Sequence, residues 1–131
     1  MFTLHERLEA DTFFVSNAPL CSVLLMNNQL FPWLILVPRV PNTCEIIDLN
    51  HHDQQRLMDE IATTSHIMKT FFKPDKLNVA ALGNQVSQLH IHVIARFTHD
   101  AAWPNPAWGA KRELYAEPPA LIEELAALFK I

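Results

Sequence analysis

Residues 88–96 read Gln-Leu-His-Ile-His-Val-Ile-Ala-Arg, a stretch in which polar and hydrophobic side chains largely alternate. Successive side chains of a β-strand point to opposite faces of the sheet, so this pattern predicts a strand with two unlike faces. One face is apolar throughout and holds Leu89, Ile91, Val93 and Ala95. The other face holds Gln88, His90, His92, Ile94 and Arg96. A row of amide, imidazole and guanidinium groups fills a core poorly, so we expect the second face to line a cleft that binds an anion.

Four more segments have the short apolar runs and turn-forming borders that are typical of β-strands. They are residues 11–15, 20–26, 33–37 and 76–82. Pro32 and Pro38 bound the third of them, and its short connection to the second favours an antiparallel hairpin. A turn at residues 83–85 favours another hairpin between the last two strands.

Helical spacing of apolar residues predicts three helices. A capping-box pattern, with Thr3 as N-cap and Glu6 three residues later, predicts a short opening helix. Residues 51–72 carry an apolar stripe and predict the longest helix, and an amphipathic pattern after Pro119 predicts the last one. The order of the elements predicts one α+β domain over residues 1–131, with a five-stranded, mostly antiparallel sheet and two main helices.

Residues 98–116, between the last strand and the last helix, show no repeat and contain Trp103, Trp108 and several prolines. Irregular segments of this kind usually fold over a part of the protein or over a ligand. We expect Trp103 and Trp108 to cover a bound base or leaving group, although packing within the protein explains such residues at least as well.

Charge and cysteine content narrow the class of protein. The chain has 10 Lys and Arg residues against 14 Asp and Glu residues and no basic block, which argues against nucleic acids and membrane surfaces as partners. Cys21 and Cys44 lack the spacing of a metal or redox motif and read as reduced thiols. The N-terminus lacks a signal-peptide pattern, and the longest apolar run, near residues 30–37, is too short to cross a bilayer. We therefore expect a cytoplasmic protein.

His90 and His92 stand two residues apart and project side by side from the polar face. A histidine pair with this spacing is common in zinc sites, but zinc takes three or four protein ligands. Arg96 on the same face disfavours a bound cation, and nothing in the sequence places the remaining candidates, which are His5, His99 and Asp100. We expect neither a metal nor a cofactor, and zinc binding remains the weaker alternative.

The stronger interpretation is phosphoryl chemistry. A neutral imidazole can attack phosphorus and form a covalent phosphoramidate, which divides one difficult displacement into two easier ones. His90 would be the nucleophile, and His92 would donate a hydrogen bond to a phosphate oxygen or to the leaving group. Gln88 would orient the reacting groups, while the turn that contains Asn84 and Gln85 would add amide donors.

Residues 83–94, Gly-Asn-Gln-Val-Ser-Gln-Leu-His-Ile-His-Val-Ile, resemble the signature of the histidine triad (HIT) superfamily, in which three histidines alternate with hydrophobic residues after a polar turn. The similarity extends to the predicted hairpin upstream and covers most of residues 20–96. It implies an α+β sandwich of five antiparallel strands and two main helices, paired as a homodimer. It also implies a hydrolase or nucleotidyltransferase that acts on the α-phosphate of nucleoside phosphoramidates or dinucleoside polyphosphates.

The resemblance also implies roles for individual residues. His90 matches the middle histidine of the family, which forms a nucleotidyl-histidine intermediate, and His92 matches the third, which contacts the phosphate and assists the leaving group. Asn27 or Asn28 takes the place of the side chain that binds the ribose hydroxyls. Asn84 takes the place of an amide near the phosphate.

The resemblance fails at one position, because Gln88 stands where the first histidine of the triad belongs. A glutamine side chain forms hydrogen bonds but does not titrate near neutral pH, so any acid–base role of that position is lost. The predicted nucleophile, His90, is retained. A nucleotide-binding module without turnover is therefore the alternative to an enzyme. Arg96, which shares the histidine face, is expected to neutralise a polyphosphate.

Overall fold

The computed structural model describes residues 1–129, so the last two residues of the expected domain lie outside the described range. The helices are α1 (Glu6–Asp11), α2 (His51–Phe72) and α3 (Leu121–Leu128), with a short 3-10 helix, η1, at Ile46–Asp48. The strands are β1 (Thr12–Asn17), β2 (Cys21–Met26), β3 (Trp33–Pro38), β4 (Lys76–Ala80) and β5 (Ile91–Arg96). Their order along the chain confirms the predicted α+β class.

The strands form one five-stranded sheet in the order β1-β2-β3-β5-β4, in which every neighbouring pair is antiparallel. Both expected hairpins are present, as β2 with β3 and β4 with β5. β5 therefore lies inside the sheet, where His92 pairs with Ile35 of β3 on one side and with Ala80 of β4 on the other. Backbone hydrogen bonds on both edges fix the position of the strand that carries this histidine.

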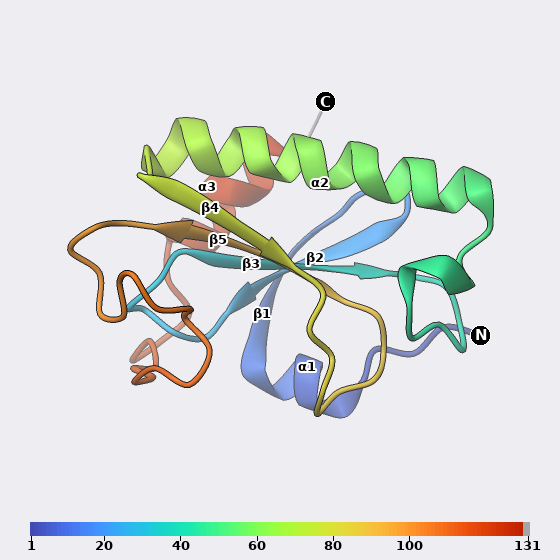
Figure 1. Ribbon diagram of the computed structural model, residues 1–131, viewed down its shortest axis with the longest axis horizontal. Helices are drawn as coiled ribbons and strands as arrows, with labels where there is room; N and C mark the ends of the chain where they lie inside the picture. Colours follow the sequence, from blue (N-terminus) through green and yellow to red (C-terminus); the bar gives the residue numbers. More distant parts are fainter. Residues whose placement is uncertain (130–131) are drawn as a thin grey trace.

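The two longer helices, α2 and α3, both cover the same face of the sheet. Figure 1 shows α2 and α3 on that face, while α1 and the loops that follow β4 and β5 lie on the other. The predicted division of the β5 side chains is confirmed, because the apolar row packs into the core under α2 and α3 and comprises Leu89, Ile91, Val93 and Ala95. Ile94 packs on the opposite side. Each fully buried aliphatic side chain contributes about 1.5–3 kcal/mol, so the helical face stabilises the fold and leaves the other face for a site.

The long helix α2 has the predicted bounds. The Asn50 side-chain oxygen accepts a hydrogen bond from the backbone N–H of Asp53 at 2.8 Å, and such a cap contributes about 1 kcal/mol. At the other end Lys73 adopts a left-handed conformation with φ 52°, and Pro74 follows. No helix within residues 1–129 combines the length and hydrophobicity that a bilayer span requires.

The start of α1 differs from the prediction. Its N-cap is His5 rather than Thr3, because the His5 Nδ1 atom accepts a hydrogen bond from the backbone N–H of Arg7 at 3.0 Å. The capping-box pattern therefore lies two residues too early, and residues 1–5 precede the helix without regular secondary structure.

The connection between β4 and β5 is longer than predicted. The ladders end at the pairs Ala80–His92 and Leu36–Ile91, so β4 stops two residues early and β5 begins at Ile91. Residues 81–90 form an irregular connection that includes Gln88 and His90. Hence the first predicted site residues lie just before the strand, where their backbone groups are free to bond with other parts of the chain.

Candidate active site

His90 and His92 line a cleft of about 370 Å³ on the sheet face that α2 and α3 leave uncovered. Each ring is largely buried, with 7% of His90 and 5% of His92 exposed. Asn84 and Gln85 reach the same cleft from the connection before β5, and Trp108 reaches it from the loop after β5. The structure thus brings together five of the residues that the sequence suggested.

Gly83 makes the turn that carries the two amide side chains into the cleft. Its φ angle is +62°, a left-handed conformation that glycine adopts without steric cost. A Cβ atom at this position would also lie 3.3 Å from the carbonyl oxygen of Val86. A glycine therefore suits this turn better than any other residue.

The hydrogen bond of the His90 ring shows which of its two nitrogen atoms carries the proton. Its Nδ1 atom lies 2.7 Å from the main-chain carbonyl oxygen of Gln88. A carbonyl oxygen only accepts hydrogen bonds, so Nδ1 carries the proton. In the neutral ring the lone pair is then on Nε2, the atom that a nucleophile requires.

His92 is held in the opposite tautomer. The indole Nε1–H of Trp33 donates to His92 Nδ1 at 2.9 Å, and an indole nitrogen is a donor only. Nδ1 of His92 is therefore unprotonated, and its Nε2 carries the proton. Burial, and to a lesser extent the neighbouring His90, lower the pKa of His92 to about 3, so this ring is neutral at pH 7.

The two rings form a matched pair whose centroids lie 4.9 Å apart. None of the hydrogen bonds among residues 1–129 occupies Nε2 of either ring. His90 thus offers an electron pair and His92 offers a proton donor at one cleft. This arrangement suits attack on an electrophile such as phosphorus, together with stabilisation of its oxygen atoms.

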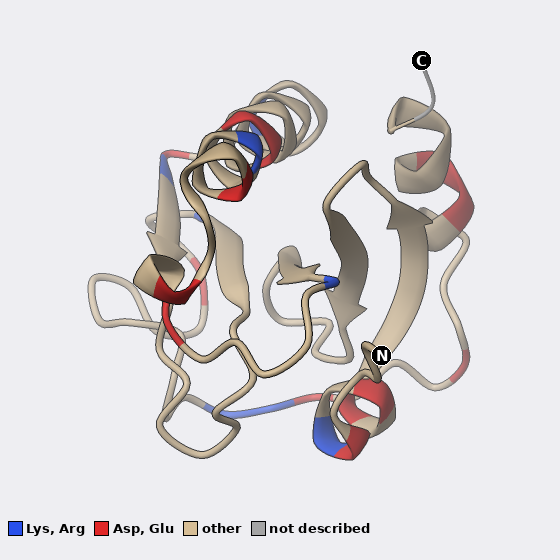
Figure 2. Cartoon of the chain, turned by 90° about the vertical axis from the view of Figure 1, so that its right-hand side faces the viewer, with Lys and Arg blue, Asp and Glu red and all other residues tan. Residues whose placement is uncertain are grey.

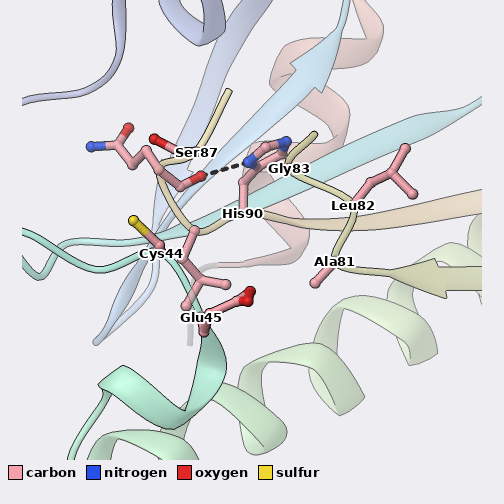
Figure 3. A pocket seen from close by; sticks show the side chains of 9 residues that line it. Cys44, Glu45, Ala81, Leu82, Gly83, Ser87 and His90 are labelled. Carbon is pink, nitrogen blue, oxygen red and sulfur yellow. Dashed lines mark hydrogen bonds between the residues drawn. The ribbon is translucent and has the colours of Figure 1, made fainter. Parts of the chain in front are cut away.

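A smaller hollow of about 240 Å³ adjoins the cleft, and His90, Leu82 and Gly83 line both. Figure 3 shows the side chains of Cys44, Glu45 and Ser87 around this hollow, with the hydrogen bond from His90 drawn as a dashed line. His90 is therefore approachable from two sides, although it is largely buried.

Trp108 packs directly on His92 of the histidine pair. Its ring centroid lies 5.0 Å from that of His92 and 5.7 Å from that of Trp33, both in edge-on geometry. Its buried Nε1–H has no hydrogen-bond partner among residues 1–129. A buried donor without a partner costs free energy, so the position of this ring is held by its packing against Trp33 and His92.

Asn27 and Asn28 do not reach the cleft; they tie the β2–β3 turn to residues near the end of the chain. The Asn27 side-chain oxygen accepts from the backbone N–H of Tyr115 at 2.9 Å. That of Asn28 accepts from the backbone N–H groups of Leu30 and Glu113 at 3.1 and 3.3 Å. Neither residue lines the cleft, so this geometry does not bring the expected ribose contact to the histidines.

Arg96 is likewise not brought to the cleft, which corrects the expectation that it neutralises phosphate. It is only 2% exposed and forms an ion pair with Asp100, with Nε 2.8 Å from Oδ2. It also donates to the Asn78 side chain and to the Asn105 carbonyl oxygen. Trp103 covers this guanidinium at 5.8 Å instead of lining the cleft. The alternating pattern places Arg96 on the correct face, but it describes neither the loop that holds Asp100 and Asn105 nor the contact with Asn78 of β4.

The side chain of Gln88 turns toward the N-terminal segment. It bonds to the backbone of Thr3 and His5 and lines the smaller hollow. Its contribution to the histidine pair is made by its main-chain carbonyl group.

Sequence reasoning missed two parts of the site. The sequence pattern places Trp33 in a strand and no more, because its bond to His92 depends on the register between β3 and β5. Arg7 and Asp11 of α1 also line the cleft. A capping pattern locates a helix along the chain but not the wall against which it packs, so the sequence carried no signal for these two residues.

The zinc alternative lacks further ligands in this geometry. Within the described range, residues 1–129, no group of three or more His, Cys, Asp or Glu side chains is placed to hold a metal ion. The pair itself would supply two of the three or four ligands that zinc takes.

The fold and the site together define an α+β protein with two histidines of opposite tautomer at a cleft beside a polar turn. A family model described as HIT domain matches residues 7–99. The chain belongs to the HIT family, whose members are generally nucleotide-binding hydrolases or transferases. The predicted superfamily and fold are thereby confirmed. No curated protein matches the chain.

Solved structures agree with this assignment. A histidine triad protein from Bradyrhizobium japonicum is 45% identical with a TM-score of 0.90, over 98% of this chain and 95% of that one. A histidine triad protein from Marinobacter aquaeolei is 48% identical with a TM-score of 0.86, over 98% and 91%. A protein of Sulfolobus tokodaii described as a hypothetical histidine triad nucleotide-binding protein shares the fold, with a TM-score of 0.64 and 16% identity over 92% and 83%.

Proposed function

We propose that this protein is a nucleotide hydrolase or nucleotidyltransferase that acts on the α-phosphate of a nucleoside phosphoramidate or a dinucleoside polyphosphate. The observation that carries the proposal is the pair of opposite tautomers at one cleft. His90 presents the Nε2 lone pair and His92 presents Nε2–H, each fixed by a hydrogen bond to the other ring nitrogen. Membership of the HIT family supports a nucleotide as the ligand.

In the first step the Nε2 atom of His90 attacks the α-phosphorus. A phosphorus–nitrogen bond forms as the bond to the leaving amine or phosphate breaks, and the leaving group takes a proton from water. The ring keeps its Nδ1 proton and becomes positively charged, so its bond to the Gln88 carbonyl oxygen becomes charge-assisted and stronger. His92 Nε2–H donates to a phosphate oxygen, where negative charge is held.

In the second step water or another acceptor attacks the same phosphorus atom. The bond to His90 breaks and the electron pair returns to Nε2. The acceptor loses its proton to solvent, and with water the product is a nucleoside monophosphate. Asn84 and Gln85 line the cleft beside the histidines and supply amide donors to the phosphate oxygens, and Trp108 contacts the nucleoside or the leaving group.

Replacing His90 with Asn tests this function. The Asn Nδ2–H₂ group can keep the bond to the Gln88 carbonyl oxygen, but nothing replaces the nucleophilic nitrogen. We expect the variant to bind AMP with nearly wild-type affinity, measured by calorimetry, and to release no AMP from adenosine 5′-phosphoramidate. Wild-type turnover in this variant would refute the proposal.

A binding module without turnover is the second candidate, because the residue at the first triad position is a glutamine whose side-chain amide bonds to the N-terminal backbone. This candidate predicts that the wild-type protein binds AMP or GMP but cleaves no phosphoramidate. The same two assays on the wild-type protein therefore separate the candidates.

We further propose that the protein works as a homodimer. β4 is an edge strand of the sheet, and its Val79 side chain is 46% exposed. An unpaired strand edge is suited to pairing with a second copy. Sedimentation of the wild-type protein and of a Val79→Lys variant tests this, with a dimer expected for the first and a shift toward monomer for the second.

A further inference from the structure

We infer that Gln88 is a positioning residue for the wall of the cleft that α1 forms, rather than a weakened catalytic residue. Its side chain joins the N-terminal segment by two hydrogen bonds. Oε1 accepts from the backbone N–H of His5 at 2.8 Å, and Nε2 donates to the carbonyl oxygen of Thr3 at 2.8 Å. The kinetic consequence of this inference rests on the proposed function.

The segment that Gln88 holds leads directly into the cleft. α1 begins at Glu6, immediately after His5, and Arg7, Leu8 and Asp11 line the cleft. Figure 2 shows that this short helix, next to the N-terminus, carries both signs of charge. α1 therefore supplies charged groups to a cleft whose histidine pair is neutral at His92.

α1 depends on contacts with the rest of the protein. A helix of six residues is too short to be stable alone in water, so its position is set by tertiary contacts. Leu8, which is 5% exposed, anchors one side of it in the core cluster with Trp33 and Ile35. The two bonds from Gln88 fix the segment that enters it.

A glutamine suits this position better than a histidine. The carboxamide carries a donor and an acceptor on one carbon atom, pointing toward the same side, so it can bond to the N–H of His5 and the carbonyl oxygen of Thr3 together. The two nitrogens of an imidazole point in divergent directions, so one ring cannot serve both groups. Replacing Gln88 with histidine would therefore complete the triad in sequence but would lose the link to the N-terminal segment.

The main-chain and side-chain roles of Gln88 are separable. The carbonyl oxygen that fixes the His90 tautomer is retained in any substitution at this position. Loss of the side chain should therefore loosen α1 and weaken nucleotide binding while leaving the chemical step intact. This predicts a change in KM and not in kcat.

Two variants break the link from opposite sides. Gln88→Ala removes the amide, and His5→Pro removes the backbone N–H, at a residue whose φ of −57° suits proline. His5→Ala is the matched control, since it removes the capping ring and keeps the N–H. Gln54→Ala is the second control, because the Gln54 amide donates to the Leu49 carbonyl oxygen and Gln54 lines neither the cleft nor the smaller hollow.

Two readouts apply to all four variants: hydrogen exchange at the backbone amides of residues 2–8, and steady-state kinetics with adenosine 5′-phosphoramidate. We expect Gln88→Ala and His5→Pro to accelerate exchange and to raise KM about fivefold, the size of one net hydrogen bond, with kcat unchanged. Gln54→Ala should leave KM unchanged, and His5→Ala, which loses only the N-cap of α1, should raise KM less than His5→Pro does. The double variant should be no worse than either single one, because both remove the same link.

Unchanged exchange in Gln88→Ala would overturn the inference, as would a fall in kcat at constant KM. Gln88→His discriminates further: we expect KM to rise and the pH profile of kcat to stay unchanged, whereas a gain in kcat would show that a catalytic histidine belongs there. If the wild-type protein neither binds AMP nor cleaves the phosphoramidate, the proposed function fails, and exchange at His5 still decides whether Gln88 holds the segment.

Discussion

The polar face of β5 has two ends that differ in one respect. At one end, Arg96 donates to Asp100, Asn78 and the Asn105 carbonyl oxygen and is closed off from solvent. At the other end, His90 and His92 each use one ring nitrogen within the protein and keep Nε2 for the cleft. At the first end the polar groups are hydrogen-bonded within the protein. At the second end the Nε2 atom of each histidine is left for a ligand.

The difference separates polar groups that stabilise a fold from polar groups that perform chemistry. Burial opposes ionisation of Asp100, but the Arg96 side chain and three backbone N–H groups outweigh it and lower the pKa of this carboxyl group. At His92 burial is not compensated, so the ring stays neutral and its Nε2–H stays available. A buried charge with an ion-pair partner, such as Asp100, indicates a structural role. A ring that burial keeps neutral and that keeps a free N–H at a cleft, such as His92, indicates a functional site.

The largest expected effect lies at the structural end. Replacing Arg96 with Met leaves Asp100 buried without its partner, which should cost about 3–5 kcal/mol of unfolding free energy. Urea denaturation measures the loss, and His90→Asn at the other end should change stability by far less. Equal losses in the two variants would remove the distinction between the ends.

The next effect is a dependence of stability on pH. The folded-state pKa of His92 is lowered to about 3 from an ordinary value of 6.5. Its stabilising contribution is complete above the unfolded pKa and falls as the pH drops from about 6.5 toward 3, by about 1.4 kcal/mol per pH unit.

His92→Asn isolates this dependence, because the Asn oxygen can still accept from Trp33 while no ring remains to titrate. Urea denaturation at pH 7 and pH 5 should show the wild type losing about 2 kcal/mol more than the variant. An identical pH response of the two proteins would mean that His92 is not held neutral by the fold.

A smaller effect is expected from the bond that fixes the His92 tautomer. Trp33→Phe removes the Nε1–H donor and should lower kcat about tenfold, because His92 is then free to place its proton on the wrong nitrogen. Trp103→Phe makes the same chemical change at a residue that covers Arg96, and it should leave kcat unaltered. A normal kcat in Trp33→Phe would show that the tautomer lock is not used.

The smallest effect concerns the Trp108 ring beside the pair. Trp108→Phe removes ring surface that lines the cleft and should raise the Kd for AMP about fivefold, because less aromatic surface is left to contact the nucleoside. Trp103→Phe is again the control, with an unchanged Kd. A Kd unaltered in both variants would assign Trp108 to packing alone.

Local patterns in the sequence predicted the strand faces, the long helix and the hairpins. The two unlike faces of residues 88–96 and the bounds of α2 follow from alternation and helical spacing, and the antiparallel hairpins follow from turn residues and short connections. Periodicity does not predict contacts between side chains of neighbouring strands. The Trp33–His92 bond, for example, depends on a register that neither strand specifies alone. Periodicity does not predict loop partners either, which is why Arg96 was expected at the phosphate although Asp100, four residues later, pairs with it.

The same reasoning applies to Gln88. The motif placed it beside the histidines as an orienting group, and its main-chain carbonyl does bond to His90. Its side chain, however, is committed to residues 3 and 5, more than 80 positions away in the sequence. Local pattern located the residue, and only the three-dimensional structure gave its side-chain partners.

The central claim is that Nε2 of His90 bonds transiently to phosphorus. Rapid mixing with labelled adenosine 5′-phosphoramidate, quenching at high pH to preserve phosphorus–nitrogen bonds, and mass spectrometry of the digested protein test it directly. We expect an adenylyl adduct on the peptide that contains His90, and no adduct in His90→Asn. Full turnover without that adduct, or an adduct on another residue, would contradict it.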